Sequence, residues 1–274
     1  MNFLFEPFQF EFMVNALLAG CLLGLVCGVL GCYVVLRGLA FVGDALAHSV
    51  LPGVVLAYVS GQSILGGALL AALLTVAMIS LISRQKRLSS DTAIGVVFTG
   101  AFATGVVIMS RLQGYTRDLA HFLFGNILAV GRHDLAFSGL VCVLVLACLV
   151  LFHRELLIVS FDPTHATKMG ISVATMRFGL LVLIAITVVS GIQAVGVILV
   201  TSLLVTPAAT ARLVTGRLTH MMALSAFFGI LSAILGLYAS YFLAVAAGAS
   251  IVLAGSLLFA MVWLATWLRF LACG

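Results

Sequence analysis

Charged residues are scarce in this 274-residue chain. Asp, Glu, Lys and Arg together make up 8% of it, whereas hydrophobic residues make up 64%. The mean hydropathy is +1.33. Soluble domains carry about 25% charged residues, so this composition excludes a soluble fold. Several apolar runs reach the roughly 20 residues that cross a bilayer as a helix. The sequence predicts an all-α, polytopic membrane protein.

Motifs for catalysis and for nucleotide binding are also missing. The chain has only two lysines, Lys86 and Lys168, and neither lies in a GxxxxGK[ST] sequence. The patterns GxSxG, HExxH and GxGxxG do not occur. The formal net charge is +5, but no basic run alternates with aromatic residues, so nucleic-acid binding is not expected. If ATP drives this protein, another subunit hydrolyses it, and we expect no enzymatic activity in this chain.

The six cysteines form no CxxC pair, and five of them lie in apolar runs. They predict neither a disulfide framework nor a thiolate metal site, but small residues that pack within the membrane.

One segment places ionisable groups inside this apolar chain: Gly43–Gly53, GDALAHSVLPG. Asp44 and His48 are four residues apart, so on a helix they share one face. Pro52 follows one turn later and would free backbone groups nearby. Ionisable residues in a membrane span are costly and mark functional sites by default. The alternative is an interhelical hydrogen-bonded pair that only holds the bundle together.

The apolar pattern predicts nine spans, or eight if the later pairs divide differently. In the first span, glycines at four-residue spacing form a smooth strip that lets another helix approach closely. The ten residues before it include two acids and no Lys or Arg, which is not typical of a cleaved signal peptide. The expected spans are Phe12–Leu36, Ala40–Val59, Ile64–Ser83, Thr92–Ser110, Leu135–Phe152, Phe178–Ser190, Gly191–Leu213, Met221–Phe242 and Ile251–Leu268.

The segment Leu119–Val130 is apolar but too short to cross. The basic cluster Arg84–Arg87 is placed in the cytoplasm by the positive-inside rule. If 119–130 is re-entrant, ten basic residues lie inside and three outside; if it crosses, this bias collapses. The charge distribution therefore favours a re-entrant segment, with the N-terminus outside and the C-terminus inside.

Polar loop segments predict two local features. Ser89–Thr92 predicts a helix N-cap, with Asp91 as a capping residue rather than a ligand. Within the polar stretch His153–Arg177, Thr164–Met169 predicts a short cytoplasmic amphipathic helix that ends at Gly170.

Asp44 and His48 are suited to bind a metal cation. If the chain is helical from Arg37 onward, Asp44 lies about 10 Å and His48 about 16 Å into the membrane. A carboxylate with a neutral imidazole suits zinc, manganese or ferrous iron, and acid weakens the binding because the imidazole must be neutral. Two ligands hold an ion weakly. Asp118 and His121 are further candidates on the outer side, unless they are interfacial capping and surface groups.

The motif GDALAHSVLPG resembles permease subunits of the bacterial ABC-3 family of zinc, manganese and iron importers. The N-terminal EPFQFEFMVNALL and the Asp-His pair are most similar to the manganese and iron branch, which includes the Sit and Yfe type systems. The resemblance extends through SSDTAIG at 89–95, FLFGNILAV at 122–130, FDPTHATKMG at 161–170 and TPAATARL at 206–213.

This resemblance implies a single permease domain over residues 1–274 in the bacterial inner (plasma) membrane, with a fold like that of type II ABC importers. It implies a homodimer or a pseudo-dimer with a related permease, a cytoplasmic ATPase pair and an external metal-binding protein. Asp44 and His48 would line the path of the transported ion, and no cofactor would be bound covalently. The segment 162–170, with Asp162, Pro163, Ala166 and Gly170, would be the coupling helix that docks on the ATPase.

Three alternatives remain open at this point. One is a zinc permease of the same family. A second is a proton-coupled secondary metal transporter with Asp44 as its proton site, although no second intramembrane acid is evident. The third, an intramembrane hydrolase at His48 or Ser49, lacks a second catalytic group at membrane depth.

Overall fold

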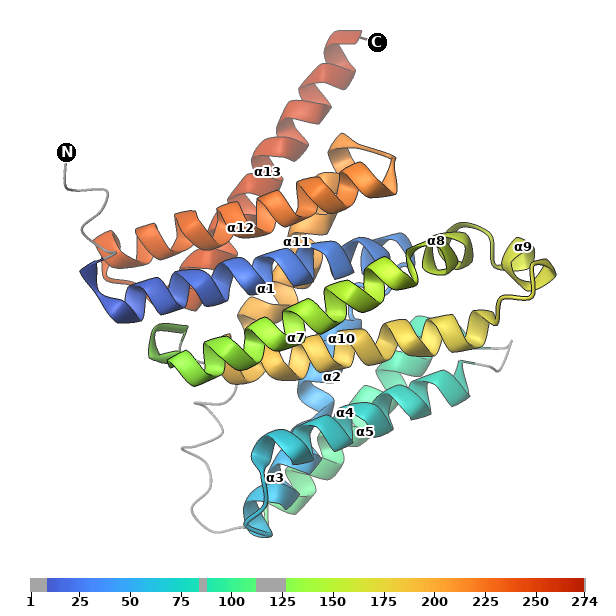
Figure 1. Ribbon diagram of the computed structural model, residues 1–274, viewed down its shortest axis with the longest axis vertical. Helices are drawn as coiled ribbons and strands as arrows, with labels where there is room; N and C mark the ends of the chain where they lie inside the picture. Colours follow the sequence, from blue (N-terminus) through green and yellow to red (C-terminus); the bar gives the residue numbers. More distant parts are fainter. Residues whose placement is uncertain (1–8, 84–87, 112–126, 274) are drawn as a thin grey trace.

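The computed structural model describes residues 9–83, 88–111 and 127–273, and within these ranges its regular structure is helical throughout. Nine segments of the described chain are long and apolar enough to cross a membrane, which confirms the predicted number of spans. Most of them run side by side as a bundle (Figure 1). The helices are α1 (Glu11–Leu36), α2 (Val42–Ser49), α3 (Leu51–Val59), α4 (Ile64–Ile82), α5 (Ser90–Met109), the 3-10 turn η2 (Ile127–Ala129), α7 (Arg132–Leu151), α8 (His153–Phe161), α9 (Pro163–Lys168), α10 (Val173–Val195), α11 (Val197–Val214), α12 (Leu218–Leu243) and α13 (Ala247–Cys273).

Serine side chains cap three of the helices. Ser63, Ser89 and Ser172 each accept a hydrogen bond from the backbone N–H three residues later, at 3.1 to 3.3 Å. Such caps satisfy backbone donors that have no partner inside the helix. The prediction that Asp91 caps α5 is wrong in detail, because Ser89 is the N-cap and Asp91 lies in the first turn.

The glycine strip of α1 lies against α12, and the close approach that the four-residue spacing predicted is observed. A Cβ atom added to Gly24 would lie 2.7 Å from the backbone carbon of Gly229, and one on Gly28 would lie 2.9 Å from the carbonyl oxygen of Ser225. The Ser225 hydroxyl donates to the carbonyl of Gly28 at 2.7 Å. Between apolar helices in lipid, such close backbone approach supplies much of the attraction.

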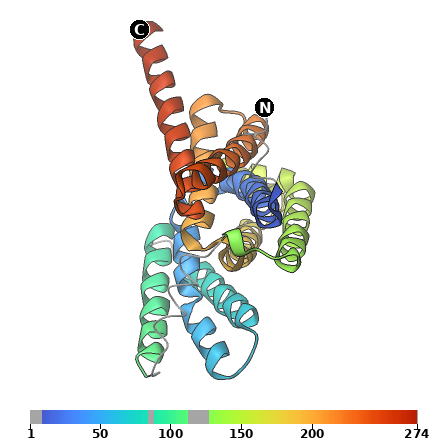
Figure 2. The ribbon, with the colours of Figure 1, turned by 90° about the vertical axis from the view of Figure 1, so that its left-hand side faces the viewer.

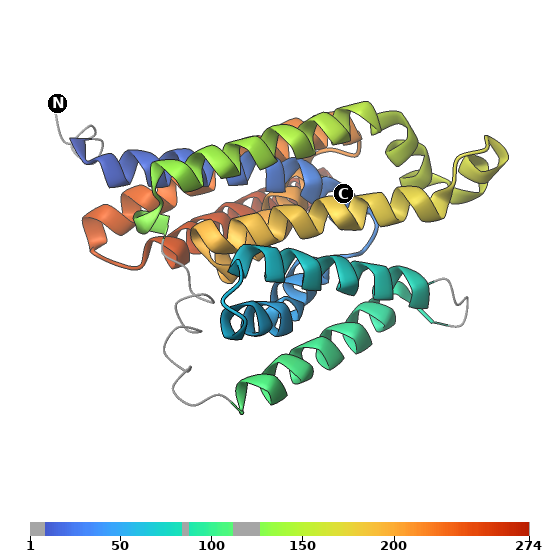
Figure 3. The same cartoon turned by 60° about the horizontal axis from the view of Figure 1, so that its bottom comes forward.

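The second predicted span is broken in two. α2 ends at Ser49, Val50 joins the two helices, and α3 begins just before Pro52, which lacks the N–H that a continuous helix would use. Beyond the break, α3 crosses α4 closely, since a Cβ on Gly53 would lie 2.2 Å from the carbonyl oxygen of Gly67. The predicted depth of Asp44 assumed helix from Arg37, but α2 begins only at Val42. Even so, Figures 1 and 3 place α2 within the length of the bundle rather than at its end.

The helices α1 and α7 begin at the same end of the bundle (Figure 3). There Arg132 Nε lies 2.7 Å from Glu11 Oε1. The end of α5 lies at this end as well. The predicted re-entrant segment 119–130 lies outside the described residues except for its last part, the turn η2 and Val130. The next span was expected to begin at Leu135, but α7 begins three residues earlier, at Arg132.

Other boundaries differ from the prediction. The stretch 153–161, expected to be a polar loop, is the helix α8. The tight turn expected before Gly191 lies instead at Gly196, whose φ of +91° ends α10 and starts α11. Gly191 lies inside α10, where an added Cβ would lie 2.6 Å from Val200. The last helix, α13, leads away from the bundle (Figure 2). Only 11% of its 18-residue apolar segment is buried.

Candidate functional site

The half-helix α2 brings the two motif residues together. Asp44 Oδ1 lies 3.6 Å from His48 Nε2, and the two side chains are 52% and 29% exposed. The spacing of four residues therefore places both donors on one face, as predicted. Two ligands about 2.1 Å from one metal ion, at a tetrahedral angle, lie about 3.4 Å apart. The observed separation is close to that of two donors that share an ion.

The rest of α2 fixes the orientation of this pair. Gly43, Ala45 and Ala47 are buried, and α2 packs against α5, α10 and α11. A Cβ on Gly43 would lie 2.8 Å from Leu204 of α11. Ser49 turns its hydroxyl back onto the carbonyl of Ala45, at 2.6 Å. The small residues let α2 lie close to its neighbours, and the face with Asp44 and His48 is left open.

Two aromatic rings of α5 flank the imidazole. The ring centroids of Phe98 and Phe102 lie 5.9 Å and 5.7 Å from that of His48, and Phe102 meets it edge-on. The rings limit the rotation of the imidazole about its side-chain torsions. The sequence alone did not point to Phe98 and Phe102, because nothing in their spacing links an aromatic pair on one helix to a histidine on another.

The pair is incomplete as a metal site. Over the ranges 9–83, 88–111 and 127–273, no three His, Cys, Asp or Glu side chains come together. Asp118 and His121, the other predicted ligands, lie outside the described residues. The cysteines Cys21, Cys27, Cys32, Cys142 and Cys148 are all unpaired.

The remaining described histidines lie away from this pair. His133, His165 and His220 are exposed, as expected for residues that border polar loops. His153 has a structural contact: its Nδ1 lies 3.0 Å from the hydroxyl of Tyr33 and joins α8 to the end of α1.

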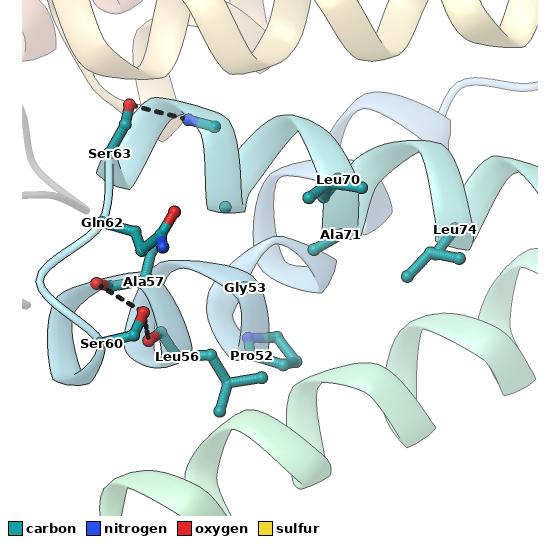
Figure 4. Close-up of a pocket in the computed structure, with 12 residues that line it drawn as sticks. Pro52, Gly53, Leu56, Ala57, Ser60, Gln62, Ser63, Leu70, Ala71 and Leu74 are labelled. Atoms are coloured by element: carbon teal, nitrogen blue, oxygen red, sulfur yellow. Dashed lines mark hydrogen bonds between the residues drawn. The ribbon is translucent and has the colours of Figure 1, made fainter.

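A cavity of about 470 Å³ lies beside the second half of the broken span, between α3 and α4 (Figure 4). Its wall is apolar and includes Pro52 and Leu56, with Ser60, Gln62 and Ser63 near the turn that joins the helices. None of the residues that line it is Asp, Glu, His or Cys. The cavity therefore offers a metal ion no strong ligand, and the donor pair of α2 is the better candidate.

The segment 162–170 is a short helix with defined ends. Asp162 Oδ1 accepts a hydrogen bond from the N–H of His165 at 2.8 Å, and Pro163 occupies the first helical position. Ala166 is buried, and Gly170 follows the helix with a φ of +78°. The predicted short helix Thr164–Met169 is confirmed within one residue as α9. It lies beyond the end of the bundle (Figure 3).

Comparison with known proteins identifies the family. Residues 9–266 match the ABC 3 transport family. The chain belongs to this family. It is thus a multi-pass protein of the plasma membrane, and its fold is that of a membrane-embedded ABC permease.

Individual relatives cover nearly the whole chain. The manganese transport system membrane protein MntC of Halalkalibacterium halodurans is 44% identical over 262 residues, which are 95% of this chain and 90% of the relative. A protein of Haemophilus influenzae named "Probable iron transport system membrane protein" is 38% identical over 252 residues, 92% of this chain and 93% of the relative. The solved structure of PsaBC from Streptococcus pneumoniae in complex with Fab superposes with a TM-score of 0.83 at 38% identity and covers 96% of this chain and 94% of that one.

Proposed function

We propose that this protein is the permease subunit of an ATP-driven importer for a divalent transition metal, manganese or ferrous iron. Membership of the ABC 3 transport family supports a transport role. The relatives described above are named for manganese and iron, not zinc. The observation on which the proposal depends most is the 3.6 Å pairing of Asp44 with His48 within an apolar bundle. A carboxylate with an imidazole suits all three metals, so the relatives' names favour manganese and iron over zinc.

The transported ion binds between Asp44 and His48 in this proposal. Asp44 supplies a charged oxygen and His48 a neutral nitrogen, while Phe98 and Phe102 hold the ring in place. The ion needs more ligands than this chain brings together in its described residues. A second permease subunit around a two-fold axis would add another Asp-His pair, and the open face of α2 leaves room for it. The full set would then be two carboxylates and two imidazoles, with water completing the shell.

The helix α9 would transmit the work of a cytoplasmic ATPase pair. Its buried face, at Ala166, packs on the permease, while Thr164, His165 and Lys168 are exposed. The cap at Asp162 and the turn at Gly170 fix both ends, so a push on the exposed face moves α8 and α10 with it. This follows the family resemblance, in which a permease receives metal from an external binding protein and an ATPase drives it. ATP-driven release requires that the two conformations bind the ion with different affinity.

The test is metal accumulation in a bacterial host that lacks its own manganese uptake and expresses the permease with its ATPase and binding protein. The variants Asp44→Asn and His48→Gln should each reduce manganese accumulation to background, with normal amounts of protein in the membrane. The matched controls Asp91→Asn and His220→Gln change the same residue types at exposed positions and should transport normally. Normal transport by both site variants would contradict the assignment of the pair.

The same host separates the alternatives. Accumulation of manganese or iron, but not zinc, supports the proposed cargo. Uptake that survives an inactive ATPase but stops when the proton gradient is dissipated would instead indicate a proton-coupled carrier.

A further inference from the structure

A second cluster of charge lies where α1 ends, just before the chain enters α2. A cavity of about 330 Å³ is lined there by two arginines, Arg37 and Arg177. Arg37 directly follows the last residue of α1, and Arg177 lies in the second turn of α10. The other residues that line the cavity are Leu36, Leu39, Ser90, Val159, Ser160, Pro163 and Val173.

The positive charge in this cavity is not neutralised by the residues around it. None of the lining residues is an acid. Asp162 precedes the cavity residue Pro163 but caps α9, and Glu155 lies on α8 without lining the cavity. The described residues contain two ion pairs, Asp44–His48 and Glu11–Arg132, and neither involves these arginines. Burial, and then the charge of Arg177, lowers the pKa of Arg37 to about 10.

Both guanidinium groups are held in place, yet one donor of Arg37 is unused. Arg37 Nε donates to the hydroxyl of Ser160 at 3.0 Å, and Arg177 donates to the hydroxyl of Ser90. The Nη2 atom of Arg37 is buried and has no hydrogen-bond partner. A buried donor of a charged group without a partner is costly, and an anion with acceptor oxygens in the cavity would remove that cost.

The N-termini of two helices add to the positive electrostatic potential in this cavity. Ser90 is the first residue of α5 and Val173 the first residue of α10, and both line the cavity. The N-terminus of a helix carries a partial positive charge and free backbone N–H groups, which favour anions. Arginine forks match the oxygens of a phosphate group better than those of a spherical ion such as chloride.

We propose that Arg37 and Arg177 form a binding site for a phosphate group at the membrane boundary where α1 ends. The phosphate belongs either to the head group of an anionic phospholipid or to inorganic phosphate. Arg37 ends a membrane span and Arg177 lies about 6 Å along α10, which is the depth of head groups rather than of acyl chains. The bound phosphate ties the end of α1 to the starts of α5 and α10, next to α9. None of the residues that line this site belongs to α2.

The test measures the thermal unfolding of the purified full-length permease with two probes. The first is reconstitution in phosphatidylcholine nanodiscs with or without phosphatidylglycerol. The second is detergent solution with sodium phosphate or sodium chloride at equal ionic strength. We expect one probe to raise the midpoint by about 5 °C, the scale for a ligand at about a hundred times its dissociation constant.

The variants Arg37→Gln and Arg177→Gln should lose most of this rise. The control Arg217→Gln removes one positive charge from an exposed position between α11 and α12 and should keep it. If the Arg37→Gln variant does not fold, the Arg177→Gln variant alone decides the comparison.

A rise with phosphatidylglycerol identifies a lipid phosphate, and a rise with phosphate in solution identifies the free ion. The proposal is overturned if neither probe stabilises the unchanged protein, or if the arginine variants respond as the control does. In that case an acidic side chain of a partner subunit becomes the better candidate for the ligand.

Discussion

Glu11 and Arg132 are 121 residues apart in the chain, yet Arg132 Nε lies 2.7 Å from Glu11 Oε1. Both side chains are exposed, at 65% and 82%, so the pair adds little to stability. It does show that α1 and α7 begin at the same face of the bundle. Among the described residues, four spans precede α7: α1, the α2–α3 pair, α4 and α5. An even number returns the chain to its starting face, in agreement with the distribution of basic residues.

The first prediction concerns the side on which each end of the bundle lies. A single cysteine at Arg132, in a chain whose native cysteines are replaced, should react with a membrane-impermeant maleimide applied to intact spheroplasts. A single cysteine at Lys168 should react only after the membrane is opened, because α9 lies at the opposite end. Labelling of position 168 in intact spheroplasts would reverse the proposed orientation.

The second prediction concerns the contact of α1 with α12. Gly24→Ala places a Cβ 2.7 Å from the backbone of Gly229, where no flexible side chain can move aside. We expect this overpacking to lower the free energy of unfolding by about 1–3 kcal/mol. The matched control is Gly139→Ala on α7, whose Cβ would meet nothing within 4 Å and should leave stability unchanged or slightly raised. Thermal unfolding in detergent compares the two, and equal midpoints would show that the close contact of α1 and α12 is not needed.

The third prediction tests α9 as the coupling helix. Gly170 has a φ of +78°, a conformation that costs other residues roughly 1–2 kcal/mol, while a Cβ there would find open space. Gly170→Ala should therefore shift the end of α9 without a clash. We expect metal-stimulated ATP hydrolysis by the assembled transporter to fall about fivefold, the factor that about 1 kcal/mol represents.

Gly61 offers a matched control for that experiment. Its φ is +65°, and an added Cβ also meets open space, but it lies in the turn between α3 and α4, away from α9. Gly61→Ala should leave the ATPase rate unchanged. If both variants lose activity equally, the effect comes from backbone strain in general and α9 has no special role.

Local rules predicted much of this molecule. Membrane spans follow from hydropathy alone, and the i, i+4 spacing of Asp44 and His48 was enough to place them on one face. The break before Pro52 follows from its missing N–H. Span ends were predicted less well where the chain stays apolar. Gly191 was taken for a turn, but it is a packing residue against Val200, while Gly196 makes the turn.

Contacts between distant segments could not be predicted from one sequence. Phe98 and Phe102 reach His48 only because α5 packs on α2, about fifty residues away in the chain. Arg37 and Arg177 are 140 residues apart and looked like two ordinary boundary charges. The helix α8 was missed because Arg154 and Glu155 made its first turn resemble a loop. Tertiary packing decides the first two of these, and packing leaves no local pattern.

The most direct test of the central claim is the coordination of Mn²⁺ in the purified transporter, measured by pulsed electron paramagnetic resonance. Nitrogen-14 coupling reports an imidazole bound directly to the ion. We predict this coupling in the unchanged protein and in His220→Gln, and its loss in His48→Gln. Coupling that persists unchanged in His48→Gln would contradict the assignment of Asp44 and His48 as the pair that holds the transported metal.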